Sequence, residues 1–206
     1  MVAVIPQRPE LFAASLRFNV DPLKAHTDAE LCGALCQVGL APLLGLDHQG
    51  RGDGGKGLLS GGLPPSSEAV TAALSMSISD GGSSLSEGEK QLISLARALL
   101  RRTPIVVVDE ATANVDYVTD RLVQTMLKEH ERFASATVLS IAHRLSTILE
   151  SDKLLVLNAG KVVAFAPPAE LLGAGGGGGG GGKGPLRETR EVKEAFRKLL
   201  QREVLV

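Results

Sequence analysis

The 206-residue sequence contains no tryptophan, one tyrosine and five phenylalanines. So few aromatic side chains offer little surface on which bases can stack, which argues against single-strand nucleic-acid binding. The formal net charge of −1 at pH 7 also means that the chain lacks a positive field that would attract polyanions. We therefore expect no nucleic-acid partner, and a core built from aliphatic side chains.

Long hydrophobic runs and cysteine pairs are also missing. The longest aliphatic run, Ile105–Val108, is far shorter than the roughly 20 residues of a membrane-spanning helix, and the N-terminus shows no signal-peptide pattern. The two cysteines, Cys32 and Cys36, are too few for a zinc site, so we expect reduced thiols. The sequence thus predicts no transmembrane segment and no structural metal.

What is present indicates an α/β fold with a parallel sheet. Apolar residues at helical spacing predict an amphipathic helix over residues 85–102, which ends before Pro104. The β-branched run at 105–108 follows at once and is typical of a strand buried on both faces. The same patterns predict strands at 2–5, 137–141 (also buried), 154–157 and 161–165, and helices at 15–18, 28–38 and 119–131.

Three segments differ in composition from the rest of the chain. Residues of about 49–77 are rich in Gly, Pro and Ser and are predicted to form a flexible insertion. Residues 173–185 contain an uninterrupted glycine run and are predicted to be a linker, followed by a charged helical tail at 186–206.

The adjacent acids Asp109 and Glu110 stand at the carboxyl end of the 105–108 strand. Ligands bind at this end of the strands in open parallel sheets. One carboxylate there can hold Mg²⁺ beside a triphosphate while the next orients, and accepts a proton from, an attacking water. Two solvated acids at a strand end are the alternative, and the pair alone does not decide between the two.

Ser86 and Gly88 stand where the 85–102 helix begins. A serine hydroxyl, exposed amides and a glycine that allows close approach are typical of a phosphate-binding helix N-terminus. The alternative is a capping box, since Glu89 follows Ser86 by three residues. The two interpretations are compatible.

Two further polar residues follow predicted strands. His143 comes directly after the 137–141 strand, from which it could reach a γ-phosphate, although a lone histidine is more often a cap or a core residue. Gln7 follows the 2–5 strand, and its amide could meet a metal-bound water. Alone, neither residue identifies a function.

Taken in this order and spacing, these segments resemble the ATP-binding cassette family over residues of about 2–172. The motifs that carry the resemblance are, in chain order, the Q-loop at 4–12, the signature at 85–89, the Walker B strand at 105–110, the D-loop at 113–116 and the switch histidine His143. Residues 16–22, 81–86 and 141–148 are similar to the second cassette of subfamily C, the multidrug-resistance-associated exporters.

The resemblance implies a partial P-loop NTPase (RecA-like) sheet with a helical subdomain. Residues 1–172 would be the C-terminal part of a nucleotide-binding domain, with a helical subdomain at about 13–102 and a Walker B half at about 103–172. The N-terminal Walker A portion is lacking, because the two near-matches, Gly50–Gly57 and Gly177–Gly184, end in glycine where a hydroxyl must reach Mg²⁺. We expect the chain to be a fragment.

The resemblance also implies ATP and Mg²⁺ as cofactors and assigns a role to each motif residue. Asp109 would position Mg²⁺, and Gln7 would sense it and the attacking water. Glu110 would be the general base, and His143 would contact the γ-phosphate.

Other residues are implied to act on a second cassette in a head-to-tail dimer. Ser86 and Gly88 would grip the γ-phosphate of ATP bound by that cassette, and Asp116 would act at the dimer seam. Glu87 and Glu89 replace the commoner Gly and Gln of the signature, and we expect their carboxylates to point away from the phosphate site.

The sequence therefore predicts the nucleotide-binding segment of an ATP-driven exporter, on the cytoplasmic face of a membrane, with transmembrane domains as partners. We expect no ATP hydrolysis by the isolated chain, because a missing phosphate loop cannot position the nucleotide. One alternative is a truncated, non-catalytic cassette that lends its Ser86 surface to a partner. The other is a lobe of a chromosome-maintenance or DNA-repair ATPase, which the absence of coiled-coil heptads disfavours.

Overall fold

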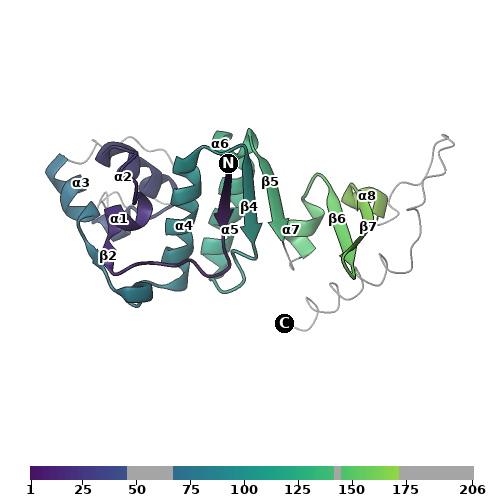
Figure 1. Ribbon diagram of the computed structural model, residues 1–206, viewed down its shortest axis with the longest axis horizontal. Helices are drawn as coiled ribbons and strands as arrows, with labels where there is room; N and C mark the ends of the chain where they lie inside the picture. The colour runs from purple at the N-terminus through teal and green to yellow at the C-terminus, as the bar shows by residue number, and fades with distance from the viewer. Residues whose placement is uncertain (46–66, 142–144, 172–206) are drawn as a thin grey trace, which may run out of the picture. The chain divides into compact units, whose positions relative to one another are not determined.

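The computed structural model describes residues 1–45, 67–141 and 145–171 of the chain. Two compact units divide at residue 141; the described residues of the second unit are 145–171, and each unit is described by itself (Figure 1). His143, the predicted linker and the predicted tail lie outside the described residues. Among the helices of the described ranges, none is both long enough and apolar enough to span a membrane.

A parallel three-stranded sheet lies at one end of the first unit, with α4 (Glu87–Arg101) between it and the helices of residues 16–37 and 67–74 (Figure 1). Its strands are β1 (Val2–Ile5), β4 (Ile105–Asp109) and β5 (Thr137–Ile141), in the order β1-β4-β5. The register places Ile5 opposite Val108 and Asp109 opposite Ile141. The predicted α/β fold with a parallel sheet is confirmed.

Alternate residues of β1 and β4 are buried, which is the pattern of strands covered on one face, and no residue of β5 is buried. Val106 and Val108 are buried, whereas Ile105 is 41% exposed and Leu139 and Ile141 are each 51% exposed. The prediction that residues 105–108 and 137–141 are buried on both faces is therefore wrong for the described chain. The apolar composition of the strands is real, but the described elements cover only one of their two faces.

Helix α4 (Glu87–Arg101) packs along β1, and α5 (Tyr117–Glu129) packs against α4 (Figure 1). The short helix α6 (Glu131–Ala134) follows α5 and adds the buried ring of Phe133 to the core. The predicted 85–102 helix is confirmed as α4. The predicted 119–131 helix is divided into α5 and α6 at His130, whose extended backbone interrupts it.

The remaining elements of the first unit lie on the side of α4 away from the sheet (Figure 1). They are β2 (Ala14–Ser15), α1 (Leu16–Val20), α2 (Asp28–Gln37), a 3-10 turn (Pro42–Leu44), α3 (Ser67–Leu74), β3 (Ser77–Ile78) and a 3-10 turn (Asp80–Gly82). Strands β2 and β3 pair antiparallel, and α1 and α2 contact α4.

The predicted flexible insertion at 49–77 is wrong for its last part. Residues 67–74 form α3, and Val70 and Leu74, spaced four residues apart, bury their side chains against the core. This apolar spacing is enough to order a helix next to Gly- and Pro-rich sequence. Residues 49–66 lie outside the described residues.

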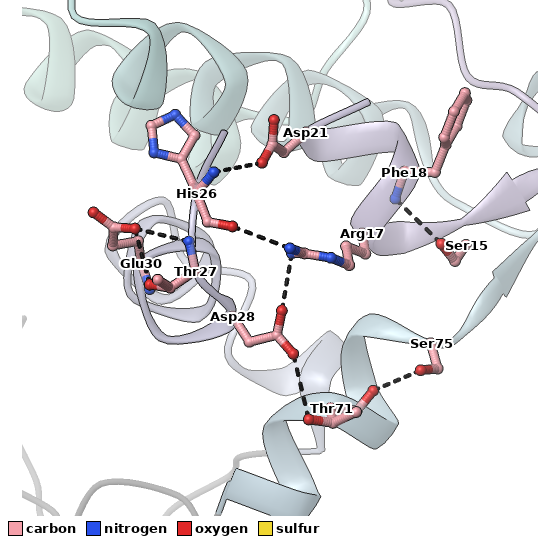
Figure 2. Close-up of polar contacts among 10 residues, drawn as sticks. All are labelled: Ser15, Arg17, Phe18, Asp21, His26, Thr27, Asp28, Glu30, Thr71 and Ser75. Atoms are coloured by element: carbon pink, nitrogen blue, oxygen red, sulfur yellow. Dashed lines mark hydrogen bonds and ion pairs between the residues drawn. The ribbon is translucent and has the colours of Figure 1, made fainter. Parts of the chain in front are cut away.

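A polar network joins α1, α2 and α3 (Figure 2). Arg17 forms an ion pair of 2.9 Å with Asp28 and donates a hydrogen bond of 3.0 Å to the backbone oxygen of His26. Asp28 also accepts a hydrogen bond of 3.3 Å from the Thr71 hydroxyl. Thr27 caps α2 and forms a capping box with Glu30. These bonds fix the three helices to one another.

The second unit contains an antiparallel hairpin of β6 (Leu154–Asn158) and β7 (Lys161–Ala166), flanked by α7 (Leu145–Leu149) and α8 (Pro168–Leu171). Ala159 and Gly160 join the strands with φ values of 48° and 75°, and left-handed residues at both positions suit a tight hairpin turn. Ile148 and Ala164 form its small buried core. The two strands predicted here are confirmed.

Candidate functional site

Gln7 and Glu110 meet at the carboxyl ends of two neighbouring strands. β1 and β4 are parallel, so the residues that follow Ile5 and Val108 emerge at the same edge of the sheet. The Gln7 side-chain nitrogen Nε2 donates a hydrogen bond of 3.0 Å to Oε2 of Glu110. The structure thus joins two residues that are 103 positions apart in the sequence.

A tight turn holds Glu110 at this edge. Its φ of 45° lies in the left-handed region, which is uncommon for a residue other than glycine. Its backbone N–H donates to the Ile141 oxygen at 3.0 Å, and its backbone oxygen accepts from the Ala113 N–H at 3.0 Å. Asp109, immediately before it, ends β4 with an exposed side chain. The two acids therefore differ in their backbone placement.

The donor set at this edge suits a hard cation. Asp109 and Glu110 offer carboxylate oxygens, and Gln7 offers an amide oxygen, which are the ligand types that Mg²⁺ prefers. Across the part of the chain that the structure describes, three or more His, Cys, Asp or Glu side chains are nowhere gathered in a metal-binding group. A cation at this edge would therefore take its remaining ligands from water or from phosphate oxygens.

Ser86 is the N-cap of α4 and forms the predicted capping box with Glu89. The Ser86 hydroxyl accepts a hydrogen bond of 3.2 Å from the Glu89 N–H. In return, Glu89 Oε2 accepts from the Ser86 N–H at 2.8 Å and from its hydroxyl at 2.7 Å. The Ser86 side chain is exposed.

Of the two signature carboxylates, that of Glu89 contacts the Ser86 hydroxyl directly. The reason is local, because the N-cap N–H and hydroxyl are unsatisfied donors that the N3 carboxylate can reach. Glu87 instead forms an ion pair of 2.7 Å with Lys90. One negative charge therefore lies directly at the start of α4.

The starts of α4 and α5 lie against each other at Gly88 and Asp116. A Cβ atom on Gly88 would lie 3.0 Å from Oγ1 of Thr119 and 3.4 Å from Oδ2 of Asp116. Gly88 therefore has a packing role, besides any role in binding phosphate. A side chain at this position would require the neighbouring Thr119 side chain to shift.

Asp116 caps α5 by accepting hydrogen bonds from the N–H groups of Val118 at 2.9 Å and Thr119 at 3.0 Å. The Thr119 hydroxyl donates a third bond of 2.7 Å. These bonds, chiefly the backbone and side-chain bonds from Thr119, lower the pKa of the Asp116 carboxyl below its usual value of 3.8. The ionised carboxylate is therefore the form that the helix end stabilises.

Because this pKa is lowered by folding, the charge of Asp116 stabilises the protein at neutral pH, and that contribution is lost as the pH falls through the folded-state pKa. We expect Asp116→Asn, which keeps a good N-cap residue, to lower the thermal midpoint at pH 7 and to lower it less at pH 3. Thermal unfolding followed by circular dichroism measures both differences. An equal difference at both pH values would contradict the assigned role of the charge.

Two site residues were missed by the sequence reasoning. Gln91 is only 3% exposed, and its Nε2 donates to the backbone oxygens of Pro6 at 3.1 Å and Gln7 at 2.8 Å. Arg97 donates to the backbone oxygens of Asn19 at 2.6 Å and Glu10 at 3.0 Å. Both are polar residues on the core-facing side of an amphipathic helix, and that is the signal that could have found them.

Comparisons with known proteins agree with this geometry. Residues 67–113 match the family described as ABC transporter. The chain is 41% identical over 171 residues to the probable multidrug resistance-associated protein lethal(2)03659 of Drosophila melanogaster, an alignment that covers 83% of this chain and 11% of that protein. It is 39% identical over 171 residues to ATP-binding cassette sub-family C member 4 of Homo sapiens, with the same coverage of 83% and 11%.

Among solved structures, a bacterial Atm1-family ABC exporter with ATP bound has a similar fold, with a TM-score of 0.67 and 24% sequence identity. The similarity covers 97% of this chain and 28% of that chain. The chain spans about 11% of the length of the curated relatives named above. The order of the motifs, the parallel sheet and the sequence identity lead to the same conclusion: the chain belongs to the ATP-binding cassette transporter family and is similar to part of a nucleotide-binding domain of its sub-family C.

Proposed function

We propose that the chain is the nucleotide-binding segment of an exporter in which ATP binding and hydrolysis drive transport through transmembrane domains, on the cytoplasmic face of a membrane. The hydrogen bond of 3.0 Å between Gln7 and Glu110 carries the proposal. It joins the Q-loop to the acid that follows the Walker B strand, at the edge of the sheet where ligands of parallel sheets bind.

Each residue of this edge has a distinct proposed task. Asp109 and Gln7 bind Mg²⁺, Gln7 partly through water, and Glu110 orients an attacking water and accepts its proton. When bound, Mg²⁺ neutralises charge on the phosphate oxygens of ATP. Gln7, which already contacts Glu110, keeps this carboxylate directed towards the same space. His143 is proposed to contact the γ-phosphate, and it lies outside the described residues.

The second proposed surface serves a partner cassette. Ser86, Gly88 and Asp116 lie at or beside the N-termini of α4 and α5, and helix N-termini favour anions. We propose that Ser86 and Gly88 contact the γ-phosphate of ATP on a second nucleotide-binding domain in a head-to-tail dimer, with Asp116 at the seam. For this to occur, Glu89 must release the Ser86 hydroxyl or the phosphate must approach past it.

A chimaera tests the catalytic part of the proposal. Residues 2–171 of this chain would replace the aligned stretch of human ATP-binding cassette sub-family C member 4, to which it is 39% identical over 171 residues. We expect the purified chimaera to hydrolyse ATP. A folded chimaera that binds ATP without hydrolysing it would instead favour the non-catalytic cassette that only lends its signature surface.

Removing the charge of the Glu89 carboxylate is expected to strengthen the association with a partner cassette, whereas most substitutions at this surface would weaken it. Glu89→Gln keeps a capping-box residue but removes the negative charge beside Ser86. We expect this variant of the 206-residue chain to associate more tightly, in the presence of ATP, with a nucleotide-binding domain that has a Walker A motif. Sedimentation velocity measures the association.

The matched control is Glu30→Gln, which makes the same change in the equivalent capping box of α2. This box has the same arrangement, since Glu30 Oε2 accepts from the Thr27 N–H at 2.8 Å and from its hydroxyl at 2.8 Å. We expect no change in association from the control. Weaker association with Glu89→Gln would show that the carboxylate helps to bind the partner.

A further inference from the structure

Gln91 is a buried polar residue whose side chain bonds to the backbone of the segment that carries Gln7. It lies on α4 and is 3% exposed. Its Nε2 donates to the backbone oxygens of Pro6 and Gln7, at 3.1 Å and 2.8 Å. Among the residues that the structure describes, its Oε1 atom is buried and has no hydrogen-bond partner.

The orientation of the Gln91 amide follows from its neighbours. A primary amide has two N–H protons, and here each is directed to one backbone carbonyl. The reverse orientation would place the amide oxygen against two carbonyl oxygens, which can only accept. Burying an acceptor without a partner is unfavourable, a cost that the two hydrogen bonds donated by Nε2 offset.

The two carbonyls that Gln91 holds belong to the segment that ends in the candidate site. Pro6 follows β1 directly, and the side chain of Gln7 donates a hydrogen bond of 3.0 Å to Glu110. Arg97, on the same helix, holds the backbone oxygen of Glu10 at 3.0 Å. Helix α4 therefore forms hydrogen bonds to the Q-loop backbone at two places, at Pro6 and Gln7 through Gln91 and at Glu10 through Arg97.

The N-cap of the same helix is Ser86. Gln91 lies five positions after it, about 7.5 Å along the helix axis at 1.5 Å per residue. One regular helix thus connects the surface that is proposed to bind the partner's phosphate to the backbone that carries Gln7.

We propose that Gln91 is a positioning residue that sets the place of Gln7 relative to Glu110 and makes it depend on the position of α4. The consequence for hydrolysis rests on the proposed function, whereas the positioning itself is a property of the folded chain. It follows that a shift of α4 when Ser86 binds its ligand moves Gln7 with it. Gln91 itself contacts no reacting atom.

The test uses the 206-residue chain without nucleotide or partner. In ¹⁵N-labelled protein, the side-chain amide signal of Gln7 is identified by its loss in Gln7→Glu. Glu110→Ala removes the acceptor of that amide and is expected to shift its signal. Gln91→Met keeps the bulk of the side chain and removes both donors. We expect the shift caused by Glu110→Ala to fall by at least half in the Gln91→Met background.

Gln124→Met is the matched control, because it makes the same change on α5. In the Gln124→Met background we expect Glu110→Ala to shift the Gln7 amide signal as much as in the parent chain. Thermal unfolding is measured in parallel to show that Gln91→Met is folded, since the variant removes an unpartnered acceptor together with the two donors to the carbonyls of Pro6 and Gln7. A full shift in the Gln91→Met background would overturn the proposal.

Gln91→Leu serves as a second variant. If neither variant folds, Gln91 is required for folding rather than for positioning, and the proposal is wrong. A failure of ATP-dependent association would disprove the proposed function but would leave this measurement intact, so the two failures can be told apart.

Discussion

Ser86→Asp should abolish or greatly weaken the ATP-dependent association of the chain with a second cassette, while lowering the thermal midpoint no more than Thr27→Asp does. Asp is among the best N-cap residues, but the new carboxylate also lies beside Glu89, which accepts from the Ser86 hydroxyl at 2.7 Å in the parent chain. The new carboxylate, however, replaces the hydroxyl that faces the incoming γ-phosphate. Like charges about 4 Å apart repel by about 1–4 kcal/mol between the limits of water and a protein surface, which weakens binding by about fivefold to several-hundred-fold.

The chain provides a matched control for this substitution. Thr27 caps α2 in the same kind of box, so Thr27→Asp makes the same chemical change away from the proposed partner surface. Sedimentation velocity with and without ATP measures association for both variants, and circular dichroism measures their thermal midpoints. Equal loss of association in both variants would show that the effect comes from the capping box and not from the phosphate site.

Glu110→Gln should lower ATP hydrolysis by the chimaera by roughly 10²–10⁴-fold, the usual contribution of a general base. The amide keeps the size of the side chain and its hydrogen-bonding capacity towards Gln7, but it cannot accept a proton from water. ATP binding should be nearly unchanged, because the phosphate contacts do not depend on this proton transfer. Single-turnover hydrolysis and nucleotide binding, measured on the same preparation, separate the two effects.

Glu129→Gln is the control for the loss of a carboxylate, since Glu129 is exposed at the end of α5. It should hydrolyse ATP at the rate of the unmodified chimaera. If Glu110→Gln also retained that rate, Glu110 would not be the base, and the interpretation of the Gln7 contact would need to be replaced.

Much of the fold could be predicted from local sequence. The spacing of Ser86 and Glu89 encodes the cap of α4, and the β-branched run before Asp109 encodes the central strand. Burial could not be predicted in the same way. Ile105 and Leu139 have the composition of residues in a sheet covered on both faces, but exposure depends on which elements are present to cover them, and periodicity alone does not contain that information.

In the candidate site, too, local sequence predicts some features, whereas others depend on tertiary packing. That Gln7 and Glu110 follow neighbouring strands could be expected, because parallel strands share a carboxyl edge, but their contact depends on side-chain orientations. The capping box of Ser86 and Glu89 could be predicted from their spacing, whereas the direction of the Glu89 carboxylate relative to a bound phosphate stays a prediction. Gln91 was missed because the sequence shows only a polar residue at a core-facing position of a helix. Its partners, the carbonyls of Pro6 and Gln7, are 85 and 84 positions away.

The most direct test of the account is the equilibrium association of the purified 206-residue chain with a nucleotide-binding domain that has a Walker A motif, measured by sedimentation with and without MgATP. The account predicts that ATP tightens the association by at least about tenfold, equivalent to about 1.4 kcal/mol, and that Ser86→Asp removes this gain. Association that is absent, or that is equally tight without nucleotide, would contradict the assignment of the α4 N-terminus as a surface for a second cassette.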